Sequence, residues 1–103
     1  MASDTLTLSA NSSRYYAALE KLKAAGGADR VRDDETKLRL YGLFKVATAP
    51  SAEVPAPRGP VLSLLDPRRS AMNEAWRRAS RETGGSADRA MGLYADTVDA
   101  LLR

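Results

Sequence analysis

The sequence predicts an all-α protein, a four-helix bundle with a long loop between its second and third helices. Apolar residues recur at helical spacing in four segments, and no segment sustains the apolar–polar alternation typical of a strand. Glycine pairs and a proline-rich stretch separate these segments. At 103 residues the chain suffices for one core, and we expect a flexible tail over residues 1–11 and the domain over residues 12–103.

The first helix is expected to run from Ser12 or Ser13, either of which can cap it, to about residue 25. The glycine pair at 26–27 is a natural stop. Its apolar face is formed by Tyr15, Ala18, Leu19 and Leu22.

The second helix is expected over residues 33–48, with acidic residues at its start and Pro50 shortly after its end. Tyr41 and Lys45 are i, i+4 neighbours on an edge beside the apolar face, so a phenol and an ammonium lie one above the other. This helix therefore has a core side and a possible ligand side. The core side is predicted to consist of Leu40, Leu43, Phe44 and Ala47.

Four of the five prolines lie in residues 47–60, which predicts a stiff, extended surface loop. The apolar run 61–65 is expected to be irregular or a single turn that packs against the core. Asp66 and Pro67 have the pattern of an N-cap followed by proline at the first helical position, and the third helix is expected to reach about residue 82. Its apolar stripe consists of Met72, Ala75, Trp76 and Ala79.

The fourth helix is predicted to follow the Gly84-Gly85 break, with Ser86 as its cap, and to run to the C-terminus. Tyr94 lies in the middle of its apolar face, which on pattern alone favours a core position. That face consists of Ala87, Ala90, Met91, Tyr94, Val98, Leu101 and Leu102.

The composition excludes several kinds of chemistry. The sequence has no cysteine and no histidine, which removes disulfides, thiol nucleophiles, imidazole bases and the usual zinc sites. The acidic start of the second helix is explained by capping, so we expect neither catalysis nor a metal. We see no signal peptide and no apolar run long enough to span a bilayer, and we expect a cytoplasmic protein.

The net charge of +3 is unevenly distributed. Residues 67–81 hold five arginines and one acid, Glu74, which is a local charge of +4. Such a block suits an anionic partner or a solvated helix face. An alternative function is therefore a basic bundle that binds nucleic acid or a protein through its third helix. We do not expect nucleic acid, because helix-turn-helix spacing and interleaved aromatic residues are absent from the sequence.

Three motifs resemble those of the acyl-CoA-binding protein family. Residues 41–48, YGLFKVAT, resemble the family pattern Tyr-x-x-Phe/Tyr-Lys-Gln-Ala-Thr. Residues 71–76, AMNEAW, resemble its Ala-Lys-Trp-Asp/Glu-Ala-Trp element, and residues 90–94, AMGLY, its Ala-Met-x-x-Tyr element. A looser match, Leu19-x-x-Leu22-Lys23, precedes them, and the motifs occur in the family's order over residues 12–102.

The resemblance implies a four-helix protein that binds medium- to long-chain fatty acyl-CoA as a lipid carrier or buffer, without a cofactor, and is not an enzyme. Tyr41 and Lys45 would then contact the CoA headgroup and Tyr94 the adenine nucleotide portion. Leu38, one turn before Tyr41, is a candidate for lining the acyl groove. We also expect ligand contact at Phe44, with Lys21 as a further candidate, and a monomer.

The chain departs from the family pattern at three positions. Met72 stands where the family has a second phosphate-binding lysine, Val46 replaces a glutamine and Asn73 an aromatic residue. Met72 itself remains a candidate ligand contact. Arg69, three residues earlier on the same helix, is our hypothesis for the replacement cation.

Overall fold

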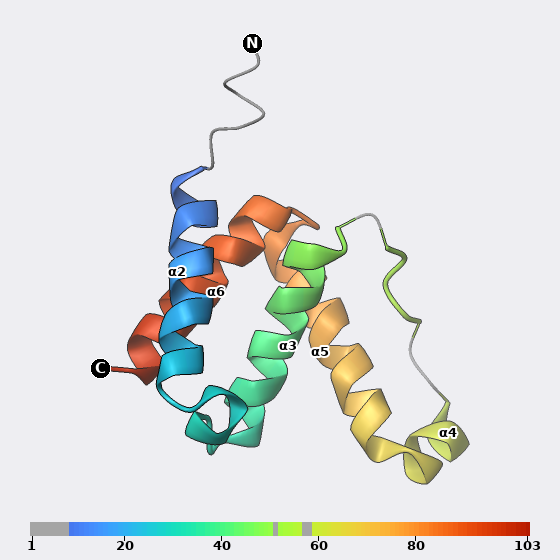
Figure 1. The fold of residues 1–103 in the computed structure, drawn as a ribbon. Coiled ribbons are helices and arrows are strands. Elements are labelled where there is room, and N and C mark those ends of the chain that lie inside the picture. The colour runs from blue at the N-terminus through green and yellow to red at the C-terminus, as the bar shows by residue number, and fades with distance from the viewer. Residues whose placement is uncertain (1–8, 51, 57–58) are drawn as a thin grey trace.

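The computed structural model describes residues 9–50, 52–56 and 59–103. Within these residues the chain forms five α-helices, one 3-10 helix and no strand, so the predicted all-α class is confirmed. The elements in Figure 1 are α2 (Ala10–Ala24), η1 (Gly27–Arg30), α3 (Asp34–Thr48), α4 (Pro60–Leu65), α5 (Pro67–Thr83) and α6 (Ala87–Leu101).

The helix α3 occupies the centre of the molecule (Figure 1). It packs against α6 on one side and α5 on the other, while α2 lies along α6 and α4 packs on α5. The core lies where α2, α3 and α6 meet. The helix α5, which packs mainly on α3, contributes Ala79 to it. The core side chains are Tyr15, Ala18, Val31, Leu40, Leu43, Val46, Ala47, Ala79, Ala90, Tyr94, Ala95 and Val98.

Three of the predicted helix starts are confirmed by their caps. The side chains of Asp33, Asp66 and Ser86 each accept a hydrogen bond from the backbone N–H three residues later. Pro67 occupies the first turn of α5, where its missing N–H costs nothing. These signals are local, which is why the sequence alone could place them.

The predicted start of the first helix was wrong. Ser9, and neither Ser12 nor Ser13, caps α2, because its Oγ accepts from the N–H of Ser12. The same hydroxyl donates to Asp88 on α6, so a contact between distant segments supports the earlier start. Of the predicted tail 1–11, residues 1–8 lie outside the described residues.

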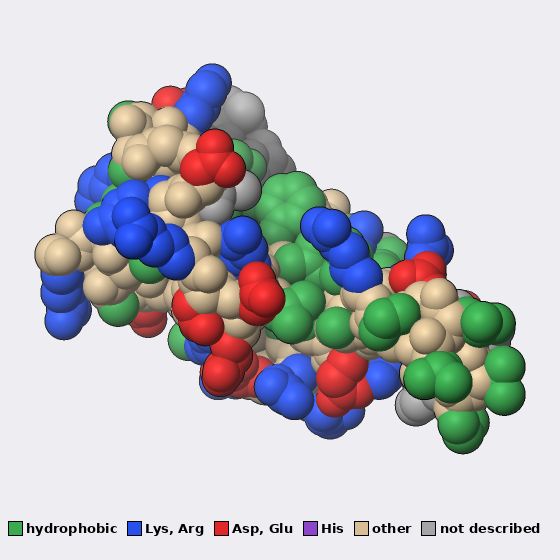
Figure 2. All heavy atoms as spheres, turned by 90° about the horizontal axis from the view of Figure 1, so that it is seen from below, with side chains coloured by type: hydrophobic (Ala, Val, Ile, Leu, Met, Phe, Trp, Pro, Cys, Tyr) green, Lys and Arg blue, Asp and Glu red, His purple; other side chains and the backbone are tan. Residues whose placement is uncertain are grey.

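The connection between α3 and α5 also differs from the prediction, because it contains the additional helix α4. Val61, Leu64 and Leu65 were expected to pack against the core, but they are 69%, 83% and 76% exposed. Their i, i+3, i+4 spacing gives α4 one apolar face, and its packing partner α5 covers another side. Figure 2 shows hydrophobic side chains gathered at this end of the molecule.

One burial prediction for the second helix needs correction. Phe44, assigned to the core face, is 41% exposed, whereas Val46 is 3% exposed. The reason is that α5 and α6 cover α3 from two sides, so the buried arc is displaced from the one that spacing alone favours. Val31, which lies between η1 and α3, is 2% exposed and also belongs to the core.

Tyr15 carries a polar atom, its hydroxyl oxygen, into the core. Its side chain is 2% exposed, its ring contacts the Tyr94 ring edge-on, and its hydroxyl has no hydrogen-bond partner among the described residues. Burial accordingly raises the pKa of Tyr15. A buried unsatisfied hydroxyl costs stability, so removing it should be favourable.

Replacing Tyr15 with phenylalanine is expected to raise the free energy of unfolding by about 1 kcal/mol, because the ring packing stays and the desolvated hydroxyl is lost. Urea denaturation followed by circular dichroism measures the change. Tyr16→Phe is the matched control, since Tyr16 is 51% exposed and should respond little. A loss of stability in Tyr15→Phe would mean that the hydroxyl has a partner, such as bound water.

Candidate functional site

The backbones of α3 and α5 approach each other closely at Gly42. A Cβ atom built on Gly42 would overlap the Ala75 carbonyl oxygen and lie 2.8 Å from its carbonyl carbon. Only glycine permits this distance between the two backbones. The two helices therefore touch at Gly42 and Ala75. Two hollows lie between the helices, and Leu38 and Ala71 line both of them.

The larger hollow has a volume of about 610 Å³. Its wall is formed by the first halves of α3 and α5, which supply apolar side chains, a phenol and three charged groups. The lining residues are Asp34, Lys37, Leu38, Tyr41, Pro67, Arg68, Ala71 and Met72. We call this space the α3–α5 cavity. It could receive an apolar chain along its floor and an anion at its charged rim.

The second hollow, of about 240 Å³, has the opposite charge balance. Its charged lining residues are three acids and two arginines, so their formal sum is −1. The two cations and one acid of the α3–α5 cavity sum to +1. The second hollow also contains an ion pair, since Arg39 donates two hydrogen bonds to Glu82 at 2.9 and 3.2 Å and thereby lowers the pKa of Glu82. An anionic ligand is therefore better suited to the α3–α5 cavity.

Tyr41 and Lys45 lie on the α5 side of α3, as their spacing predicts. Tyr41 lines the α3–α5 cavity. One turn further on, the Lys45 ammonium lies 4.6 Å from the centre of the Trp76 ring, a cation–π contact between the two helices. Lys45 is half-buried, so its aliphatic stem is held while its charge stays accessible.

Tyr94 belongs to the core and does not line the α3–α5 cavity. It is 6% exposed, and its ring lies 5.1 Å from that of Tyr15 in an edge-on arrangement. Burial raises the pKa of Tyr94. A phenol is neutral near pH 7 even at its ordinary pKa, so Tyr94 is able to donate a hydrogen bond. The core position favoured by its pattern is confirmed.

The other predicted site residues divide between those that line the α3–α5 cavity and those that do not. Leu38 and Met72 both line the α3–α5 cavity. Phe44 is not among its lining residues. Lys21 lies on α2, where its ammonium is 3.7 Å from the carboxylate of Asp99 on α6.

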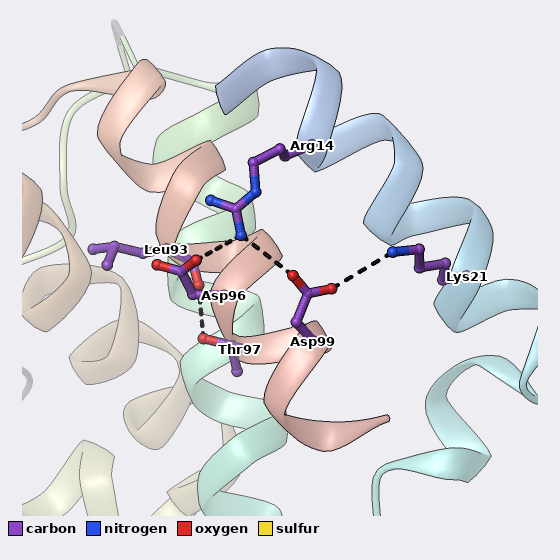
Figure 3. A network of polar contacts seen from close by, with 6 residues as sticks. All are labelled: Arg14, Lys21, Leu93, Asp96, Thr97 and Asp99. Carbon is purple, nitrogen blue, oxygen red and sulfur yellow. Dashed lines mark hydrogen bonds and ion pairs between the residues drawn. The ribbon is translucent and has the colours of Figure 1, made fainter. Parts of the chain in front are cut away.

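Figure 3 shows the ion-pair network that holds Lys21. Arg14 on α2 contacts Asp96 at 2.6 Å and Asp99 at 3.3 Å, and Lys21 contacts the same Asp99. All four side chains are largely exposed, so each pair adds little stability. This network joins α2 to α6, whereas the α3–α5 cavity lies between two other helices.

Most of the arginine block is paired with acids on its own helix. Glu74 forms ion pairs with Arg77, Arg78 and Arg81, which lower the pKa of Glu74. Arg77 also donates to the carbonyl oxygen of Pro55 and so ties the preceding loop to α5. Arg69 lies 3.7 Å from Asp66 and does not line the α3–α5 cavity.

Two cations of the cavity were missed by the sequence reasoning. Lys37 lies four residues before Tyr41 on α3, and Arg68 lies four residues before Met72 on α5. Neither forms an ion pair with any described residue. The helical spacing of four was a usable signal, because it places each cation on the same face as its cavity residue.

In the described part of the chain, acidic side chains do not gather in any group of three that could hold a metal ion. No helix of these residues has the length and apolar character needed to cross a membrane.

The fold and the cavity define a small all-α binding domain with an anion-compatible cavity between two of its helices. Residues 12–98 match the family model described as Acyl CoA binding protein. The match covers most of the chain, and the chain therefore belongs to the acyl-CoA-binding protein family. None of the curated proteins and none of the solved structures matches it. Membership of the family supports acyl-CoA binding in general.

Proposed function

We propose that the protein binds medium- to long-chain fatty acyl-CoA esters, one per monomer, and acts as a cytoplasmic carrier or buffer. The observation that carries the proposal is the family match over residues 12–98, within which Tyr41 borders a cavity of about 610 Å³. The cavity combines apolar lining with a formal charge of +1. An acyl-CoA ester likewise combines an apolar chain with a strongly anionic headgroup.

The headgroup is assigned to the edge of α3 that faces α5. Lys45 would donate a charge-assisted hydrogen bond to a CoA phosphate, and Tyr41 would offer a hydroxyl and a ring face. The half-buried Lys45 is pre-oriented by Trp76, which reduces the entropy lost when a phosphate binds. Tyr94 remains a proposed contact of the adenine nucleotide, and its neutral phenol is the donor that such a contact would use.

The acyl chain is assigned to the floor of the α3–α5 cavity. Leu38, Ala71 and Met72 supply its apolar lining from both helices. Burial of each methylene group of the ligand is worth about 0.8 kcal/mol, so chain length should contribute strongly to affinity. Met72, in place of the family lysine, adds apolar surface here and removes a donor.

The thioester would be sheltered and left intact, because the chain offers no thiol or imidazole to attack it or to move a proton. Binding of this kind needs no cofactor. The nucleic-acid alternative gains no support, since the arginines at 77, 78 and 81 face Glu74 and Arg69 faces Asp66.

Calorimetric titration of the protein with palmitoyl-CoA, below its micelle concentration, tests the proposal. We expect tight one-to-one binding of the ester and much weaker binding of free CoA and of palmitate, because each half fills only part of the site. Heat of equal size from palmitate alone would indicate a general fatty-acid site. Absence of heat from all three ligands would refute the carrier function.

A further inference from the structure

The cation that the family pattern places on α5 is missing at Met72, yet the α3–α5 cavity keeps a positive rim. The four residues concerned form two pairs at helical spacing: Lys37 precedes Tyr41 by one turn on α3, and Arg68 precedes Met72 by one turn on α5. All four line the same space. The two cations therefore approach the cavity from opposite walls.

These cations differ from the rest of the basic block in having no ion-pair partner among the residues that the structure describes. Every other arginine between residues 67 and 81 forms an ion pair with Glu74 or Asp66. Lys37 and Arg68 form none with the described residues. Both side chains are exposed, so neither charge carries a desolvation penalty.

Among the described residues that line the α3–α5 cavity, Asp34 is the one acid, and it opposes an anion there. Two cations against one carboxylate still leave a formal charge of +1, and an arriving phosphate carries more negative charge than Asp34. The planar guanidinium of Arg68 suits two parallel hydrogen bonds to phosphate oxygens, and the ammonium of Lys37 acts as a point charge.

We propose that Lys37 and Arg68 form a phosphate-binding pair at the rim of the α3–α5 cavity and replace the lysine that is absent at Met72. The inference rests on the proposed function, since the phosphate belongs to the CoA headgroup. The pair moves part of the positive charge from the second turn of α5, where Met72 lies, to the first turn of α5 and to the facing helix α3. Met72 is then free to extend the apolar floor.

Calorimetric titration with palmitoyl-CoA tests the pair in the full chain. Arg68→Met and Lys37→Met are each expected to weaken binding roughly 10-fold, because a charge-assisted hydrogen bond is lost at a partly solvated rim. Arg69→Met is the matched control, one residue away and paired with Asp66, and should bind as the wild type does. Circular dichroism should show unchanged folding, since all three side chains are exposed.

A rescue separates phosphate binding from a merely structural role. Adding Met72→Lys to Arg68→Met should recover most of the lost affinity, because the new ammonium lies one turn away on the same wall. Asp34→Asn should tighten binding several-fold by removing the opposing charge. No recovery and no tightening would contradict a phosphate site at this rim.

A second ligand identifies which phosphate is held. If Arg68 and Lys37 hold the ribose 3′-phosphate, the two substitutions lose their effect on the 3′-dephospho form of palmitoyl-CoA. If they hold the pyrophosphate, the effect persists with that ligand.

The pair is refuted if the wild type binds palmitoyl-CoA and both variants bind it equally well. A loss of affinity confined to Arg69→Met would instead support Arg69 as the cation that replaces the missing lysine. Failure of the wild type itself to bind would remove the proposed function.

Discussion

Replacing Gly42 with alanine is expected to lower the free energy of unfolding by about 1–3 kcal/mol. The added methyl group would collide with the carbonyl group of Ala75, which is backbone and cannot rotate away as a side chain can. Alanine also gains about 1 kcal/mol over glycine in a helix interior, but a collision at this distance forces α3 and α5 apart and outweighs that gain. The stated loss is the net effect.

Thermal unfolding followed by circular dichroism measures this change, with roughly 4–8 °C expected for each kcal/mol in a domain of this size. Gly59→Ala is the matched control, because a Cβ atom there meets nothing within 4 Å. Separation of the helices should also widen the α3–α5 cavity beside Tyr41 and weaken palmitoyl-CoA binding. An unchanged melting temperature for Gly42→Ala would mean that α3 and α5 are further apart in solution.

Replacing Lys45 with methionine is expected to weaken palmitoyl-CoA binding by roughly 10- to 100-fold. The estimate follows from a charge-assisted hydrogen bond worth about 1.5–3 kcal/mol. Methionine keeps an apolar stem against Trp76, so the packing between α3 and α5 should survive while the charge is lost. Calorimetry gives the affinity, and the fluorescence of Trp76, the only tryptophan, gives an independent titration.

Two substitutions control this experiment. Lys23→Met removes a cation from an exposed position on α2 and should leave the affinity unchanged. Lys45→Arg keeps the charge and should retain most of the binding. Equal affinity of Lys45→Met and the wild type would place the headgroup elsewhere, and the rim formed by Lys37 and Arg68 would then be the principal phosphate contact.

The sequence by itself determined the four long helices and most of their ends. Asp33, Ser86 and the Asp66-Pro67 pair act within their own turn, so no knowledge of distant residues was needed to predict them. The spacing of Tyr41 and Lys45 likewise determined that the two residues share one edge of α3. Three motifs in the right order then indicated the family.

The tertiary structure decided which arc of each helix is covered. Helical spacing gives the angle between side chains but does not say where a neighbouring helix will pack. Because α3 is packed between α5 and α6, Val46 is buried and Phe44 is not. For the same reason Arg68, and not Arg69, reached the cavity beside Met72. Ser9 became a cap partly through Asp88, a residue 79 positions away, which no local signal could reveal.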